Sequence, residues 1–382
     1  MNKKTVIIAG CSIIGVLIVL IVIVWLLTIF KTHYFTYEEV ETKMVDATKA
    51  FYKSNPEILP VDDGKTVLPY STLESNGFIK PLNELLKDGD TCSAEMNVIK
   101  NGDDYSYIPK LTCSDKYITR LLYEQILNDH SVITEGSGLY QAEDGTYYFK
   151  GKITNNYIAL GTTGSGKNKK DILWQIMSID PEGNIRIRST ERIGDKTEYD
   201  NRYNVDRETN TGYNDFEMSL LKDFLIALEK DDEFLTSDER SKLIKTNLCI
   251  GKRTQTDTTK DGSTECATKT VEAMMFSSLT PYEYMRASLD ENCKSTMDKS
   301  CPNFNFLSYE GTLANWTLTG LAENSYQTYV FNGEDFVIYN ARSRNYVYPV
   351  ATVSSYTPYK SGNGTKETPY RLFKEVKKST EN

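Results

Sequence analysis

The sequence predicts an α+β protein built from a transmembrane helix, a small helix-plus-antiparallel-sheet domain and a larger mixed α+β domain. Three features of the 382-residue chain support this prediction: an uncharged apolar run near the N-terminus, six cysteines that flank short segments, and an amphipathic helical pattern between two series of strand-like runs. We place the domains at residues 1–31 (N-terminal tail and membrane helix, 5–30), 32–135 (small domain), 136–375 (larger domain) and 376–382 (polar tail).

The apolar run extends from Thr5 to Phe30 and contains no charged residue. As a helix it would be about 39 Å long, which exceeds the roughly 30 Å hydrocarbon core of a bilayer. Lys3 and Lys4 precede it and favour a cytoplasmic N-terminus. A cleaved secretory signal and a lipoprotein site at Cys11 are the alternatives. Because the run continues far past Cys11, the sequence favours a single-pass protein of the cell membrane with the bulk of the chain extracellular.

Six of the seven cysteines follow the apolar run, and an even number there predicts disulfide bonds in an oxidising exterior. Metal ligation is the alternative, but the chain has no C-x-x-C pair and only two histidines, His33 and His130. The sequence therefore predicts no metal site. The spacing of the cysteines favours local closure into three pairs: Cys92 with Cys113, Cys249 with Cys266, and Cys293 with Cys301.

Charge and loop chemistry argue against nucleic-acid and nucleotide partners. The formal net charge of −9 would repel the phosphates of DNA or RNA. The segment GTTGSGKN (161–168) comes within one residue of a nucleotide-binding P-loop, but its last position is Asn168, which lacks the hydroxyl that would ligate Mg²⁺. A strand pattern follows where a P-loop requires a helix to bind the phosphate. We predict a hairpin turn here, with no bound nucleotide and no cofactor.

The small domain is predicted to begin with a helix that continues outward from the membrane segment. Val40, Met44 and Phe51 recur at helical spacing, which predicts a helix to about Lys53. A capping box at residues 71–74 predicts a short second helix. An Asn-Gly turn between two strand-like runs predicts a hairpin inside the first cysteine pair.

This plan resembles that of a type IV pilin or pseudopilin, in which a long N-terminal helix packs on a small antiparallel sheet. The resemblance covers about residues 5–115 and concerns the plan rather than a motif. The sequence lacks the cleavage glycine and the glutamate of a true prepilin. The resemblance implies a pilin-like fold for the small domain.

The larger domain is predicted to combine short strands with helices. Strand-like runs include DILWQIMSID (171–180) and NIRIRST (184–190), which a turn rich in Asp, Pro and Gly joins. Residues 214–229 place apolar side chains on one face, which predicts an amphipathic helix. Residues 271–279 are predicted to form a buried strand, and the capping signals of Thr280–Glu283 predict a helix after it.

An ordered series of short motifs in this domain resembles an uncharacterised Gram-positive cell-surface domain family, related to the C-type-lectin-like fold of formylglycine-generating enzymes. The motifs are NNYIAL, ILWQIMSIDPEGNIRI, LTPYEYMRAS, NWTLTG, YVYPVATV and SGNGTKETPYRL, together with paired local cysteines, over roughly residues 138–373. The resemblance implies a C-type-lectin-like domain around a twisted antiparallel sheet and implies no catalysis. Family members commonly carry an arginine where this chain has Tyr348.

For function, the sequence favours a membrane-anchored binding or structural surface protein that is not an enzyme. Adhesion, or recognition of a cell-wall component, a glycan or a protein partner, would suit such a protein. Trp316, Tyr326 and Tyr329 are candidate ligand contacts, because aromatic faces stack on sugars or anchor a protein partner. The alternative for these three residues is packing in the core or on a strand face.

Two other functions stay open. The pilin-like plan suits a minor component of a pilus-like or secretion assembly. An extracellular hydrolase would need paired carboxylates, and acidic residues crowd the loop before the amphipathic helix. A solvated acidic surface or a weak calcium site is the alternative for that loop. Its acidic residues are Asp195, Glu198, Asp200, Asp206, Glu208 and Asp215.

Overall fold

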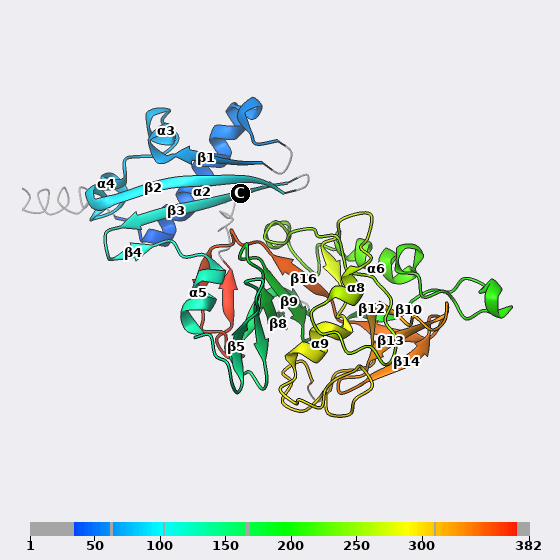
Figure 1. Ribbon diagram of the computed structural model, residues 1–382. Helices are drawn as coiled ribbons and strands as arrows, with labels where there is room; N and C mark the ends of the chain where they lie inside the picture. The colour runs from blue at the N-terminus through cyan, green and yellow to red at the C-terminus, as the bar shows by residue number, and fades with distance from the viewer. Residues whose placement is uncertain (1–33, 62–63, 102–103, 165–168, 309–310, 373–382) are drawn as a thin grey trace, which may run out of the picture. The chain divides into compact units, whose positions relative to one another are not determined.

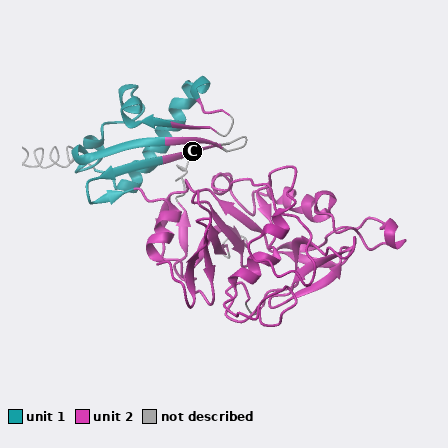
Figure 2. Ribbon diagram, viewed as in Figure 1, with its two compact units in different colours: residues 1–58, 67–96, 109–118 teal, residues 59–66, 97–108, 119–382 magenta. Residues whose placement is uncertain are grey.

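The computed structural model describes residues 34–61, 64–101, 104–164, 169–308 and 311–372 (Figure 1). The described chain separates into two compact units (Figure 2). The first unit takes its described residues from 1–58, 67–96 and 109–118, and the second from 59–66, 97–108 and 119–382.

The predicted fold class is wrong. The described chain is mixed but mostly β, whereas the sequence predicted an α+β protein with a transmembrane helix, a pilin-like domain and a C-type-lectin-like domain. Eight α-helices are described, and the longest, α2 (Tyr37–Ser54), has 18 residues with charged side chains along its length. Short strands outnumber helices in the described chain, and one predicted helix, at residues 214–229, is divided into two shorter pieces.

The predicted location, a single-pass protein of the cell membrane, is also wrong as judged from the described residues. None of the helices described there is both long enough and apolar enough to cross a bilayer. The run at residues 5–30, on which the prediction rested, lies outside the described residues.

The first sheet has four strands in the order β1-β2-β3-β4. Helix α2 buries Val40, Met44 and Phe51, so the predicted helical face is confirmed. The helix begins after Thr36, whose hydroxyl accepts a hydrogen bond from the backbone N–H of Glu39 (3.2 Å). The elements of this part are η1 (Pro56–Ile58), β1 (Lys65–Pro69), α3 (Tyr70–Ser75), α4 (Leu82–Leu85), η2 (Gly89–Thr91), β2 (Cys92–Asn101), β3 (Asp104–Cys113) and β4 (Tyr117–Ile118). The predicted capping box at residues 71–74 is wrong, because α3 begins directly after Pro69 without a side-chain cap.

The second unit contains a nine-stranded sheet in the order β11-β16-β9-β8-β7-β18-β17, with the β5-β6 hairpin joined to β8. Most of its ladders are antiparallel, and β18 pairs with β7 in parallel. Its strands are β5 (Gly138–Gln141), β6 (Tyr147–Lys150), β7 (Tyr157–Thr163), β8 (Lys170–Ile179), β9 (Ile185–Ser189), β11 (Phe276–Ser277), β16 (Val350–Val353), β17 (Tyr359–Ser361) and β18 (Tyr370–Leu372). The strand predicted over residues 271–279 is confined to β11, and Val271 is 85% exposed.

A five-stranded sheet lies in the same unit, in the order β10-β15-β12-β13-β14. Trp174 on the larger sheet and Trp316 on the smaller one are fully buried in one apolar core. Each indole N–H donates to a backbone carbonyl, of Leu160 and Thr197 respectively, at 2.8 Å. The strands of the smaller sheet are β10 (Ile193–Glu198), β12 (Asn315–Gly320), β13 (Gln327–Phe331), β14 (Phe336–Asn340) and β15 (Arg344–Val347).

Short helices join these strands. The predicted helix at residues 214–229 is divided into η5 (Phe216–Met218) and α6 (Leu220–Leu228), because Ser219 is extended and caps the second piece. The helix predicted after Thr280 is confirmed as α9 (Pro281–Ala287), with a capping box between Thr280 and Glu283. The other helices of the unit are α5 (Leu122–Asp129), η4 (Val205–Arg207), α7 (Ser237–Arg240) and α8 (Ser263–Cys266).

The glycine-rich segment begins within β7 and leads to the antiparallel strand β8. Lys170 already belongs to β8, so a strand follows the loop where a P-loop requires a helix. Residues 165–168 lie outside the described residues.

Three disulfides join Cys92 to Cys113, Cys249 to Cys266, and Cys293 to Cys301, so the prediction of disulfide bonding is confirmed. The Cys249–Cys266 bridge encloses a fully buried ion pair, in which Arg253 Nη1 donates to Glu265 Oε1 at 2.7 Å. Burial raises the pKa of Glu265, and Arg253 opposes that shift.

Breaking this ion pair provides a test of the fold. Arg253→Met should lower the free energy of unfolding by about 3–5 kcal/mol, because it leaves the Glu265 carboxylate buried without its cation. Lys299→Met is the matched control: Lys299 pairs with Asp335 but is 77% exposed, so its loss should cost less than about 1 kcal/mol. Urea unfolding of both variants measures the loss of unfolding free energy. Equal losses in the two variants would contradict the conclusion that the Arg253–Glu265 pair is buried and stabilises the fold.

Candidate functional site

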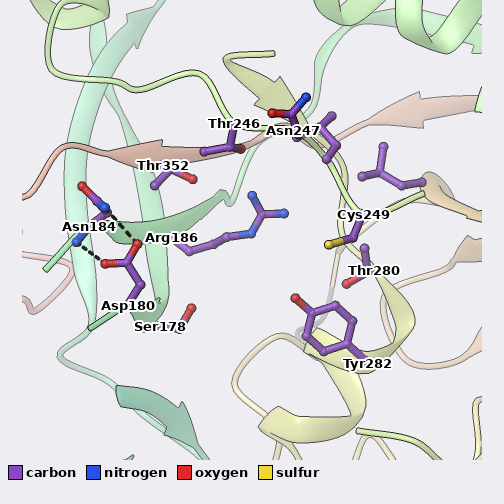
Figure 3. A pocket seen from close by; sticks show the side chains of 12 residues that line it. Ser178, Asp180, Asn184, Arg186, Thr246, Asn247, Cys249, Thr280, Tyr282 and Thr352 are labelled. Carbon is purple, nitrogen blue, oxygen red and sulfur yellow. Dashed lines mark hydrogen bonds between the residues drawn. The ribbon is translucent and has the colours of Figure 1, made fainter. Parts of the chain in front are cut away.

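A cavity of about 220 Å³ opens on the second unit, beside the nine-stranded sheet and helix α9 (Figure 3). Strands β8, β9 and β16 supply Ser178, Arg186 and Thr352. The opposite wall comes from the segment 246–249 and from Thr280 and Tyr282 at the start of α9. Figure 3 shows the Arg186 guanidinium between these two groups of side chains.

Register explains why polar side chains gather on this part of the sheet. Arg186 pairs with Ser178 on one side and with Thr352 on the other, so the three residues form a row across adjacent strands. Alternation along β9 sends Ile185 and Ile187 to the other face, where both are fully buried. Strand pairing therefore places a cation and two hydroxyl groups side by side.

The turn between β8 and β9 supplies a carboxylate to the cavity. Asp180 accepts hydrogen bonds from the backbone N–H of Asn184 (2.7 Å) and from its side-chain amide (2.9 Å; Figure 3). Gly183 has a φ of 88°, which the tight turn requires, and the ring of Tyr123 fills the space that a Cβ would need. The turn fixes Asp180 at the rim of the cavity.

Arg186 is held by an ion pair to α9. Its Nε donates to Glu283 Oε1 at 2.6 Å, and its Nη2 donates to the hydroxyl of Ser277 at 3.1 Å. Burial alone would raise the pKa of Glu283, but the Arg186 guanidinium and two hydrogen bonds from Thr280 outweigh it and lower that pKa. Glu283 is therefore a carboxylate at neutral pH and neutralises Arg186.

Several polar atoms that line the cavity have no hydrogen bond to the described part of the chain. These are Nη1 of Arg186 and the hydroxyl groups of Tyr282, Ser178, Thr246 and Thr352. Burial raises the pKa of Tyr282 to about 12, so its hydroxyl stays protonated and available as a donor. Buried polar groups usually find a partner in protein or ordered water, so these groups can still form hydrogen bonds to a bound ligand or to water.

The predicted ligand contacts lie elsewhere. Trp316 and Tyr329 have no exposed surface and pack in the core, where neither can meet a ligand. Tyr326 is half-buried directly before β13, and its hydroxyl accepts a hydrogen bond from Arg207 Nη1 at 2.6 Å. None of the three lines the Arg186 cavity.

Sequence reasoning missed Arg186, Asp180 and Tyr282. A signal existed for Arg186, because an arginine between two isoleucines on a strand must face away from the core side. Asp180 was assigned to turn chemistry, which it does perform. No pattern in the sequence indicates that Tyr282 lies at the cavity of Arg186, because its position depends on how the disulfide-closed segment packs against α9.

The acidic loop has structural contacts. Asp200 is buried and forms an ion pair with Arg202 at 2.6 Å. Asp206 accepts a hydrogen bond from the hydroxyl of Ser325, and Asp215 accepts one from a backbone N–H of η5. Over the described ranges, no three His, Cys, Asp or Glu residues are grouped so that they could hold a metal ion.

His130 borders a second cavity of about 280 Å³. Burial lowers its pKa, so the ring is neutral at pH 7. Its Nε2 lies 3.4 Å from the hydroxyl of Tyr370, which donates to Asp129 at 2.9 Å. The His130 ring thus contacts Tyr370, and it also packs edge-on against the ring of Phe149 with centroids 4.9 Å apart.

None of three comparisons with known proteins identifies a relative of this chain. No family model, no curated protein and no solved structure matches this chain. The resemblance to a cell-surface domain family stays a prediction from its motifs.

Removing Arg186 tests the electrostatics of the cavity. Arg186→Leu should lower the free energy of unfolding at pH 7 by about 3 kcal/mol, because Glu283 then keeps a buried charge without a cation. The cost should shrink as the pH falls, since Glu283 without Arg186 takes up a proton more readily. Urea unfolding at pH 7 and pH 4.5 measures both effects.

The double variant Arg186→Leu/Glu283→Gln is the control, and it should recover much of the loss at pH 7. A cost for Arg186→Leu that is independent of pH and unchanged in the double variant would contradict the ion pair.

Proposed function

We propose that this chain is a binding protein whose ligand is a small, neutral, hydroxyl-rich molecule, such as one sugar residue of a glycan. The observation that carries the proposal is the set of polar groups around Arg186 that make no hydrogen bond to the described part of the chain. A sugar hydroxyl both donates and accepts hydrogen bonds, so it can accept from Arg186 or Tyr282 and donate to Asp180 in the same site.

The size of the cavity supports a small ligand. Pockets for drug-sized ligands measure about 300–1,000 Å³, whereas this cavity measures about 220 Å³. It suits a single ring or a chain end better than an extended polymer. The ring of Tyr282 and the side chains of Leu248 and Leu318 supply apolar surface for the carbon face of such a ligand.

The charge of the cavity supports a neutral ligand. Glu283 compensates Arg186 at 2.6 Å, and Asp180 adds a further negative charge at the rim. An anion would therefore meet a site with no excess of positive charge. Arg186 serves as a fixed hydrogen-bond donor rather than as an anchor for a carboxylate or a phosphate.

The state of the carboxylates favours binding over hydrolysis. A general acid needs a carboxyl group with a raised pKa, whereas the pKa of Glu283 is lowered and its oxygens are occupied by Arg186 and Thr280. Each oxygen of Asp180 accepts one hydrogen bond from Asn184 and can accept another from a ligand hydroxyl. The hydrolase that the acidic loop suggested gains no support from this site.

A conservative variant tests the site. Tyr282→Phe removes one hydroxyl that makes no hydrogen bond to the described chain, so it should leave the unfolding midpoint unchanged and weaken sugar binding about 2- to 10-fold. Titration of the full chain with glucose, galactose, mannose, N-acetylglucosamine and glucuronate, followed by NMR or calorimetry, measures the affinity.

Tyr339→Phe is the matched control, because Tyr339 is 41% exposed on β14 and does not line the cavity. It should bind like the unaltered chain. Tighter binding of glucuronate than of every neutral sugar, or no saturable binding of any of them, would refute the proposal.

A further inference from the structure

A lysine and an asparagine lie in contact beside β12, away from the Arg186 cavity. Lys252 Nζ is 2.6 Å from Asn214 Oδ1, although the two residues are 38 positions apart in the chain. An amide carbonyl bond is about 1.2 Å long, so the amine nitrogen lies no more than about 3.8 Å from the carbonyl carbon Cγ. Reacting atoms in near-attack geometries are about 3–3.5 Å apart.

The asparagine is held rigidly. Asn214 is 2% exposed, and its backbone N–H donates to the carbonyl of Ser325 at 2.8 Å. A Cβ added to Gly320 would lie 3.2 Å from Asn214 Cγ, so the backbone of β12 lies directly against the carboxamide. The group cannot turn away from Lys252 without disturbing this packing.

The three carbonyl groups around Asn214 Nδ2 can accept more hydrogen bonds than a carboxamide nitrogen can donate. Asn214 Nδ2 lies 2.8, 2.8 and 2.6 Å from the backbone carbonyls of Leu321, Asn324 and Gln327. A carboxamide has two N–H donors, so one of the three carbonyls receives no proton from it. An ammonia molecule or an ammonium ion at the same position would satisfy all three.

Lys252 is suited to act as an amine. The residue as a whole is exposed, but partial burial of its amine lowers its pKa, and the nearby Asp215 opposes that shift. Its ammonium group donates to a neutral carboxamide, and no ion pair to a carboxylate is formed within the described residues. A weakly compensated lysine loses its proton more easily, which is how lysine nucleophiles are activated.

We propose that Lys252 and Asn214 form an intramolecular isopeptide bond. Lys252 gives a proton to Asp215 or to water, and its nitrogen lone pair attacks Asn214 Cγ. The Cγ–Nδ2 bond then breaks, and the departing nitrogen takes up two protons: the one first passed to Asp215 or water, and one from the attacking nitrogen of Lys252. An alkylammonium and a carboxamide thus give a secondary amide and an ammonium ion, and no oxidant, metal or cofactor is consumed.

Mass spectrometry of the purified full-length chain tests the bond directly. After reduction of the disulfides, the intact mass should be lower than the sequence mass by one ammonia, about 17 Da. Trypsin should release one branched species that joins residues 208–222 to residues 246–253, with no cleavage after Lys252. Unmodified mass, with both linear peptides recovered, would overturn the proposal.

Two lysine variants separate this bond from other losses of ammonia. Lys252→Arg keeps the charge but has no nucleophilic amine, and it should show the full mass. Lys245→Arg is the matched control: Lys245 pairs with Glu229 at 2.8 Å and is 47% exposed, so this variant should still lose the ammonia. An asparagine can also lose ammonia to its own backbone as a succinimide, so a loss that persists in Lys252→Arg would overturn the proposal.

Discussion

The ion pair between Arg186 on β9 and Glu283 on α9 is the constraint on which the candidate site depends. It joins the polar face of the nine-stranded sheet to the helix above it at 2.6 Å, and Glu283 is 4% exposed on its side chain. Two charges are stable there because each is the partner of the other and because Thr280 supplies further hydrogen bonds. The same pair fixes the position of the Arg186 donor groups and cancels the charge of Arg186. It therefore determines the shape of the cavity and its proposed preference for a neutral ligand.

A second arginine, Arg188, lies two residues after Arg186 on β9. Arg188 is fully buried, and its guanidinium lies 5.4 Å from the ring of Phe331 and 5.2 Å from that of Tyr348. Tyr348 therefore supplies an aromatic face to a buried cation.

The disulfide-closed segment supports the other wall of the cavity. Cys249 lines the cavity itself, and the Arg253–Glu265 pair lies inside the segment that Cys249 and Cys266 close. Glu265 also accepts a hydrogen bond from the backbone N–H of Tyr282, and a Cβ on Gly262 would meet the Tyr282 ring at 3.0 Å. Loop, bridge and helix therefore position Tyr282 together.

The sequence predicted what depends on local patterns. The cysteine bridges, the buried face of α2 and the capped start of α9 follow from spacings of a few residues. It failed where an alternative local interaction prevailed, as at Ser219, which divides the helix predicted at residues 214–229. The candidate site could not be predicted from local patterns, because strand register and the path of the loops bring Arg186, Glu283 and Tyr282 together.

A crystal structure of the full chain soaked with a neutral sugar tests the central claim most directly. The account predicts electron density for one sugar ring in the Arg186 cavity, with its hydroxyl groups within hydrogen-bond distance of Arg186 and Tyr282 and with the Glu283 pair intact. Density at another place on the surface with the cavity left to solvent, or a cavity closed by movement of Arg186 away from Glu283, would contradict it.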